Sequence, residues 1–351
     1  MSSARLTIDL AALEANYRIF ERVGSIGAVV KADAYGLGVG PVTRRLLRSG
    51  CADFFVAHAR EGIEVALLLQ NERVKGRVWV FEGFTGWNAE LIAESGLIPV
   101  LNSASQIDAF RRAGGGQCGL HIDTGMQRLG VPFEQIDSLN ARGLQVELLL
   151  THFACADTPE HPLNALQMQR FDTIRQLFYG VPVSVGGSAA LLGSYVQHLP
   201  SKHVSRPGIG LFGGNPLNSG QNPMLTVAVL EARVVQIREV SAGTPLGYGA
   251  SFETKRVTRI ATVGVGYADG VSRALSNRGA FAVNGSRAPI LGRVSMDLTQ
   301  IDVTDVDVAE GDWIEVMGHT VTLDDVARTA GTVSYEILTG LGPRLERIYR
   351  E

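Results

Sequence analysis

The sequence predicts an α/β protein with an N-terminal (β/α)8 barrel, followed by a smaller, mainly β domain. Over roughly the first 220 residues, eight short apolar runs alternate with segments of helical length, which is the pattern of such a barrel. The pattern changes after the segment 213–223, GGNPLNSGQNP, whose Gly, Pro and Asn residues break both helix and strand. At 351 residues, the chain is long enough for two domains. We therefore expect a barrel over residues 1–222 and a mainly β domain over residues 223–351.

The first predicted element is an amphipathic helix in the segment 8–23, IDLAALEANYRIFERV. Its apolar residues recur at spacings of three and four after a capping Asp9. The eight predicted barrel strands follow in the runs IGAVVKA, DFFVAHA, RVWVFEG, LIPVLNS, CGLHIDTG, VELLLTHFA, PVSVGGS and HVSRPGIGLFG. Helical segments such as GVGPVTRRLLRSG and NALQMQRFDTIRQLF lie between most of them.

The second domain is predicted from apolar runs that are separated by turn residues with little helix between them. These runs are LTVAVLEARVVQIREV, RIATVGVGYA, GAFAVNG and DWIEVMG, and a short helix is expected around TLDDVARTAG.

Composition and charge exclude several classes of partner. The net charge of −3 and the pI near 6.2 provide no broad basic surface for nucleic acid or for an anionic membrane. The cysteines Cys51, Cys118 and Cys155 are far apart and in no metal-ligand spacing, so we expect a reducing compartment and no metal. The N-terminal segment has charges at Arg5 and Asp9 and no apolar core, so no signal peptide is expected, and no run of eighteen apolar residues occurs. A cytoplasmic protein is the expectation.

Polar residues follow the predicted barrel strands at their C-terminal ends, where barrels of this kind form their active sites. In order of the strands, they are Lys31 and Tyr35, then Asp123 and Arg128, His152, Gly187 and Ser188, and finally Arg206, Gly208 and Ile209.

Lys31 is the most informative of these residues. An arbitrary lysine lies on the surface or in an ion pair, but this one follows the apolar residues AVV and would point into the barrel mouth. Desolvation or cationic neighbours would there favour a nucleophile or a Schiff-base lysine. The turns GGS and RPGIG, which follow the seventh and eighth runs, offer backbone N–H groups for a phosphate. A phosphate and a Schiff-base lysine on one barrel face indicate pyridoxal phosphate.

The sequence also resembles the bacterial alanine racemases. The segments VVKADAYGLG, DTGMQRLG, THFACAD, RPGIGLFG, GYGASF, VGYADG and GRVSMD match, in order, the signatures of that family over nearly the whole chain. The resemblance implies a fold-type III pyridoxal-phosphate enzyme, an isomerase of alanine, with a head-to-tail homodimer and an amino acid as its substrate.

The resemblance also implies the catalytic roles. Lys31 would hold the cofactor through a Schiff base and then act as one catalytic base, and Tyr248, reaching in from the partner subunit, would be the opposite base. Arg206 would face the pyridine nitrogen, and Arg128 would contact the phenolic oxygen of the cofactor and help to bind the substrate. His152 would bridge Arg206 and the incoming Tyr248. Taken alone, His152 could equally be a core histidine, and Tyr248 an ordinary tyrosine of a β domain.

The remaining implied contacts concern the phosphate and the substrate. The phosphate would bind Tyr35, Ser188, Gly208 and Ile209. Met296 would bind the substrate carboxylate through its backbone N–H, and Tyr267 would line the entrance.

One departure from the family pattern bears on Arg128. Many relatives carry a lysine, often carbamylated, at the position of His121, where carbamylation is impossible. We therefore predict that a bound anion such as chloride, or a nearby acid, supports Arg128.

Other activities stay open at this point. A racemase of broader specificity, acting on serine for example, is the first alternative. A non-catalytic pyridoxal-phosphate carrier is disfavoured because it needs no domain bearing Tyr248. A fold-type III decarboxylase is disfavoured because Arg206, rather than an acid, would face the ring nitrogen.

Overall fold

A computed structural model describes residues 3–22, 24–138, 143–193, 202–217 and 220–351. The chain divides into two compact units. One comprises residues 14–211 and 215–223, and the other comprises residues 1–13, 212–214 and 224–351. The predicted division differs at the N-terminus, where the first 13 residues join the mainly β unit.

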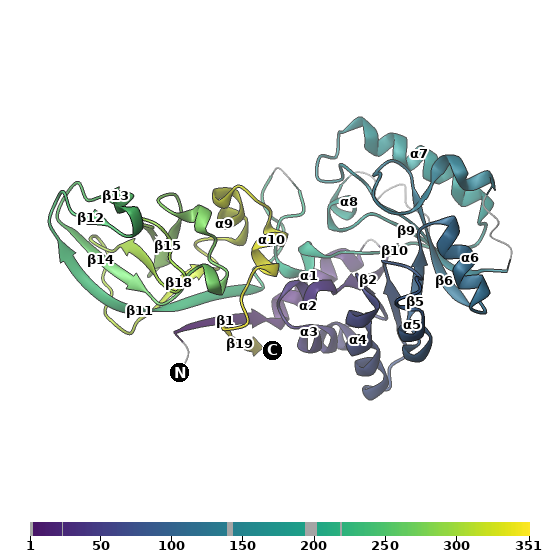
Figure 1. Cartoon of the computed structure of the whole chain (residues 1–351), viewed down its shortest axis with the longest axis horizontal. Coiled ribbons are helices and arrows are strands. Elements are labelled where there is room, and N and C mark those ends of the chain that lie inside the picture. The colour runs from purple at the N-terminus through teal and green to yellow at the C-terminus, as the bar shows by residue number, and fades with distance from the viewer. Residues whose placement is uncertain (1–2, 23, 139–142, 194–201, 218–219) are drawn as a thin grey trace. The chain divides into compact units, whose positions relative to one another are not determined.

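The first unit is a nearly closed barrel of eight parallel strands with helices on its outside, as predicted (Figure 1). Its strands pair in the order β10-β2-β3-β4-β5-β6-β8-β9, and one parallel bridge, Val183 to His203, links the two ends of this series. The strands are β2 (Ser25–Val29), β3 (Asp53–Val56), β4 (Arg77–Val80), β5 (Ile98–Leu101), β6 (Gln117–Asp123), β8 (Gln145–Thr151), β9 (Val183–Val185) and β10 (Val204–Ser205). A two-residue strand, β7 (Val131–Pro132), pairs with β6.

The barrel strands form where β-branched and aromatic residues are buried on both faces. All four residues of β3 are buried, and the Phe55 ring stacks on Trp79 of the neighbouring strand. The helices are α1 (Leu10–Glu21), α2 (Lys31–Tyr35), α3 (Val39–Arg48), α4 (Ala59–Asn71), α5 (Ala89–Ser95), α6 (Ala104–Arg112), α7 (Pro162–Leu177) and α8 (Ser188–Leu192). The Asp9 side chain accepts a hydrogen bond from the Ala12 N–H at 2.7 Å, so it caps α1 as predicted.

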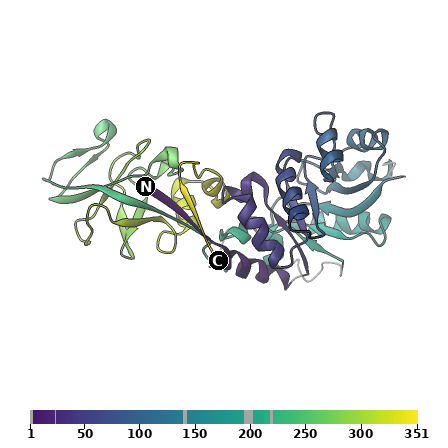
Figure 2. The ribbon, with the colours of Figure 1, turned by 90° about the horizontal axis from the view of Figure 1, so that it is seen from below.

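The second unit is built on an eight-stranded sheet. Its strands are β1 (Ala4–Asp9), β11 (Ala228–Val240), β14 (Thr258–Val263), β15 (Ala280–Val283), β16 (Ser286–Pro289), β17 (Thr299–Asp302), β18 (Trp313–Met317) and β19 (Glu346–Arg350). β1 pairs antiparallel with β11 and parallel with β19, so the first and last strands of the chain lie side by side (Figure 2). Short elements complete the unit: β12 (Pro245–Leu246), β13 (Phe252–Glu253), α9 (Leu323–Ala330) and α10 (Ser334–Thr339).

In the part of the chain that the structure describes, no helix is long and apolar enough to cross a membrane. Cys51 and Cys118 are buried free thiols, and Cys155 is a partly buried free thiol.

Candidate active site

Lys31 begins a turn of unusual handedness at the C-terminal end of β2. Ala32, Asp33, Ala34 and Tyr35 have φ values of 53°, 53°, 51° and 58°, so α2 winds as a left-handed turn made of residues other than glycine. Each such residue costs about 1–2 kcal/mol relative to a right-handed turn. Strain of this kind persists only where surrounding contacts fix the backbone, and it is concentrated at functional sites.

The surroundings of Lys31 favour its neutral amine. Burial lowers the pKa of Lys31, the nearby Arg128 lowers it further, and the Glu61 carboxylate acts in the opposite direction. A lysine of this kind is a better nucleophile and base than an exposed one.

Arg206 supplies a buried guanidinium at the end of β10. Its Nη2 donates to the Thr151 carbonyl at 2.8 Å, and its central carbon lies 6.0 Å from the centre of the Phe55 ring. Its Nη1 is buried and has no hydrogen-bond partner among the described residues. Burial lowers the pKa of Arg206 to about 9, so the group is still protonated at neutral pH. A buried donor without an acceptor indicates that a ligand atom binds there.

The predicted phosphate residues converge next to Arg206. Ser188 opens α8, and its Oγ accepts hydrogen bonds from the Gly208 N–H at 2.9 Å and the Gly210 N–H at 3.2 Å. A Cβ on Gly208 would lie 2.2 Å from the Tyr35 hydroxyl, so only glycine allows these two residues to approach. Ile209 begins a short 3-10 helix, η3 (Ile209–Phe212), and is buried.

These features fit pyridoxal phosphate. A lysine of lowered pKa, a buried donor without a partner and a glycine-lined cradle are present on one barrel face, as the cofactor's aldehyde, ring nitrogen and phosphate require. We find no cluster of potential metal ligands among the residues that the structure describes.

His152 follows β8 and lies in the same cationic environment. Burial lowers the pKa of His152 well below its usual value, and Arg206, Arg128 and Lys31 act in the same direction. The ring is therefore neutral, and the positive charge at this place is that of Arg206. No hydrogen bond joins His152 to Arg206 in this structure, so the bridging role of His152 stays a prediction.

Arg128 is exposed and forms no ion pair within the described ranges, including none with Asp123. The Asp123 carboxylate instead accepts hydrogen bonds from the N–H groups of Gly125 and Met126, both at 2.8 Å. Of the two supports predicted for Arg128, no acid is paired with it here, and the anion stays a prediction.

His121, in β6, is held by Asn102, which follows β5. Its Nδ1 lies 2.9 Å from Asn102 Oδ1. Because the Asn102 amide group donates to the carbonyls of Phe81 and Val100, Oδ1 is an acceptor, and His121 Nδ1 therefore carries the proton. Burial lowers the pKa of His121 to about 3, with Arg206 acting in the same direction, so the ring is neutral.

The remaining predicted residues lie in the mainly β unit. Tyr248 begins a short turn, η4 (Tyr248–Ala250), and is 71% exposed. Tyr267 begins η5 (Tyr267–Asp269), and backbone hydrogen bonds from the N–H groups of Tyr267 and Ala268 to the carbonyls of Ser295 and Met296, both at 3.0 Å, place it beside Met296. A Cβ on Gly266 would lie 2.3 Å from the Ser295 carbonyl, so this contact requires glycine.

Two polar residues of the barrel mouth were missed in the sequence. Glu61 stands three positions after His58 at the start of α4, which is the spacing of a capping box and could have singled it out. Asn102 follows β5 and offered no local signal beyond its place after a strand.

Comparison with known families agrees with this geometry. The family model of the alanine racemase N-terminal domain matches residues 8–216, and that of the alanine racemase C-terminal domain matches residues 227–349.

Individual relatives extend over the whole chain. An alanine racemase of Rhizobium meliloti is 42% identical, with 99% of this chain and 97% of the relative covered. Two alanine racemases of Agrobacterium fabrum, one biosynthetic and one catabolic, are 40% and 41% identical, with 98% and 99% of this chain and 93% and 92% of the relatives covered.

Solved structures show the same likeness. Alanine racemase from Bartonella henselae with covalently bound pyridoxal phosphate matches with a TM-score of 0.91 at 34% identity, and all of both chains is covered. The biosynthetic alanine racemase from Pseudomonas aeruginosa matches with a TM-score of 0.89 at 33% identity, again over all of both chains. This chain therefore belongs to the alanine racemase family of pyridoxal-phosphate isomerases.

Proposed function

We propose that the protein interconverts L- and D-alanine by a two-base mechanism and supplies D-alanine for peptidoglycan from the cytoplasm. The observation that carries this proposal is Lys31, partly buried at the barrel mouth, with its pKa lowered by burial and by Arg128. Racemisation removes a proton from one face of the substrate Cα and returns a proton on the other face. Two bases on opposite faces do this without rotating the substrate.

Lys31 Nζ is the base on one face. Its lowered pKa favours the neutral amine, which is the form that accepts a proton. The left-handed turn begins at the residue after Lys31.

Tyr248 of the partner subunit is the base on the other face. Within one chain, Tyr248, Tyr267 and Met296 belong to the mainly β unit, whereas Lys31 belongs to the barrel unit. The high exposure of Tyr248 supports a role outside its own unit. A head-to-tail homodimer would bring the two sets together, which is why we propose that the active site is shared between subunits.

Arg206 orients the cofactor ring. Pyridoxal phosphate, when bound, supplies the electron-withdrawing ring that acidifies the substrate Cα–H. Because Arg206 keeps its proton, its Nη1 would hold the ring nitrogen of the cofactor as a hydrogen-bond donor and would not protonate it. Neutral His152 would accept a hydrogen bond from Arg206 with one ring nitrogen and donate a hydrogen bond to the oxygen of the incoming Tyr248 with the other.

Three anionic groups need partners at the barrel mouth: the cofactor phosphate, the cofactor phenolic oxygen and the substrate carboxylate. Ser188, Gly208, Ile209 and Tyr35 would hold the phosphate. The Ser188 Oγ accepts from the Gly208 N–H, so its own hydroxyl proton is free to donate to the phosphate together with the Tyr35 hydroxyl and the Ile209 N–H. Arg128 binds the phenolic oxygen, and the Met296 N–H and Arg128 hold the substrate carboxylate.

Deuterium exchange tests the two-base assignment. The holoenzyme is incubated with L- or D-alanine in deuterated water, and Cα exchange and enantiomer ratio are followed. Tyr248→Phe should leave the cofactor absorbance intact and suppress exchange from L-alanine more than from D-alanine. Exchange from both enantiomers at the wild-type rate would remove Tyr248 from the mechanism. Serine in place of alanine, run in parallel, measures how strict the specificity is.

A further inference from the structure

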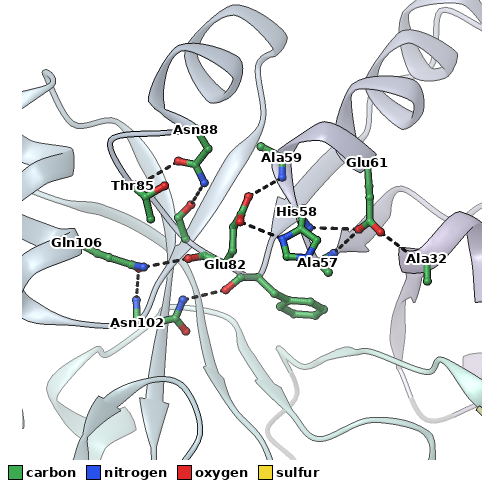
Figure 3. A network of polar contacts seen from close by, with 12 residues as sticks. Ala32, Ala57, His58, Ala59, Glu61, Glu82, Thr85, Asn88, Asn102 and Gln106 are labelled. Carbon is green, nitrogen blue, oxygen red and sulfur yellow. Dashed lines mark hydrogen bonds and ion pairs between the residues drawn. The ribbon is translucent and has the colours of Figure 1, made fainter. Parts of the chain in front are cut away.

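Glu61 connects the turn that carries Lys31 to the neighbouring helix. It lies in the first turn of α4, and its Oε1 accepts a hydrogen bond from the Ala32 N–H at 2.8 Å. Its Oε2 accepts from the N–H groups of Ala57 at 2.9 Å and His58 at 3.2 Å (Figure 3). One carboxylate therefore binds the residue after Lys31 with one oxygen and the end of the next barrel strand with the other.

The turn that follows Lys31 needs such a contact. Its residues are held in a left-handed conformation that none of their side chains favours. Within the turn, the Ala34 N–H donates to the Val30 carbonyl at 2.9 Å, but the Ala32 N–H points out of the turn to Glu61. Glu61 thus holds the turn at the residue that follows the lysine.

We propose that Glu61 is a positioning residue for Lys31, which fixes the direction of the lysine by holding the Ala32 N–H against the β3–α4 loop. This inference rests on the proposed role of Lys31 as the cofactor lysine. Glu61 itself binds backbone N–H groups and is assigned no contact with the reacting atoms or the cofactor. Its effect on Lys31 is transmitted through the backbone, by way of the Ala32 N–H that its Oε1 accepts from at 2.8 Å.

The same corner of the barrel contains a matched control. The Glu82 carboxylate also lies at the start of α4, where it accepts from the Ala59 N–H at 2.8 Å and lies 3.0 Å from His58 Nδ1 (Figure 3). Glu82 does not contact the Lys31 turn. Glu82→Gln therefore removes one carboxylate from the same helix terminus and leaves the Ala32 contact in place.

The experiment compares variants as holoenzymes. Glu61→Gln keeps the size of the side chain. Its single oxygen stays with the two N–H groups of Ala57 and His58, so its amide nitrogen faces the Ala32 N–H and cannot accept from it. Glu61→Asp keeps the charge but is one methylene shorter and loses the reach to Ala32. Glu64→Gln, at an exposed position on the same helix, is the neutral control.

Three measurements separate positioning from simple support of the helix. Hydrogen exchange over residues 31–35 should become more than about tenfold faster in both Glu61 variants and stay unchanged in Glu82→Gln, because only Glu61 covers the Ala32 amide. The turnover number kcat should fall about 10- to 100-fold in both Glu61 variants with KM for alanine nearly unchanged. The midpoint temperature of thermal unfolding should be lowered by a similar amount in Glu61→Gln and Glu82→Gln.

Two results would overturn the inference. The first is kcat and exchange in Glu61→Gln equal to those of Glu82→Gln. The second is full recovery of kcat in Glu61→Asp, because charge alone would then be sufficient. Borohydride reduction of the holoenzyme with peptide mapping distinguishes these failures from a failure of the proposed function. A label on another residue rejects Lys31 itself, whereas a label on Lys31 with either result above rejects only Glu61.

Discussion

Replacing Gly208 by alanine should weaken cofactor binding through Tyr35. The added Cβ would lie 2.2 Å from the Tyr35 hydroxyl oxygen and 3.0 Å from Cζ. Comfortable contacts between carbon and a heavy atom start near 3.5 Å, so the hydroxyl has to move by more than about 1 Å. Tyr35 is buried and has little free space. Such overpacking costs about 1–3 kcal/mol, which corresponds to a cofactor Kd raised about 5- to 150-fold if the bound state needs Tyr35 in place.

A titration of the cofactor-free protein with pyridoxal phosphate, followed by absorbance, measures this Kd. Tyr35→Phe, which removes the hydroxyl, should weaken binding by itself, but the double variant Gly208→Ala/Tyr35→Phe should lose less than the sum of the two single changes. Gly86→Ala, where nothing lies within 4 Å of the added methyl group, is the control. Additive losses in the double variant would refute the steric argument, because no shared contact would then couple the two positions.

Three further outcomes follow from the barrel mouth and the mainly β unit. Burial, with Arg206 acting in the same direction, lowers the pKa of His121 to about 3 in the folded protein. In the unfolded chain the same histidine takes up a proton near pH 6.5, so the free energy of unfolding should fall as pH decreases from 6.5 toward 3. Chemical denaturation should show wild type losing about 1–2 kcal/mol more than His121→Gln between pH 7 and pH 5, and equal losses would contradict a neutral His121. Crystals soaked in bromide should show an anomalous peak beside Arg128, whereas water alone there would reject the predicted anion. Arg344 pairs with Asp269 at 3.0 Å and Asp297 at 2.8 Å, which joins the two loops that bear the predicted substrate contacts. Arg344→Lys should raise KM for alanine a few-fold with a smaller change in kcat, and a fall in kcat at constant KM would argue against this role.

The barrel was predictable because its strands are short-range signals. In the run RVWV, the three residues after Arg77 are apolar and buried on both faces, and a strand is predicted there without knowledge of its neighbours. The strand β1 was missed because its partners, β11 and β19, lie far away in the sequence. Its apolar residues Leu6 and Ile8 alternate with the polar residues Arg5, Thr7 and Asp9, but the adjacent helix signal was stronger.

The ends of the barrel strands were predictable from the sequence, but the backbone conformation of the turn after β2 was not. A left-handed turn is not the preferred conformation of a segment such as Ala32–Ala34, which contains no glycine, so the sequence does not predict it. Glu61 illustrates the same limit, since its capping-box spacing describes its bonds to the loop before α4 and says nothing of Ala32. Tertiary contacts decide both features.

The charge of the barrel mouth was also hidden in the sequence. The whole chain carries a net charge of −3, yet Arg128 acts on Lys31, and both Arg128 and Arg206 act on the two neutral histidines, His121 and His152. Among the electrostatic neighbours of Lys31 in the described residues, Glu61 is the acid that opposes Arg128. Cations gathered with so little opposing charge are unfavourable unless anions bind between them. In the proposed site, the phosphate, the phenolic oxygen of the cofactor and the substrate carboxylate would supply that charge, so a cluster of cations that would destabilise an empty protein suits pyridoxal phosphate and an amino acid.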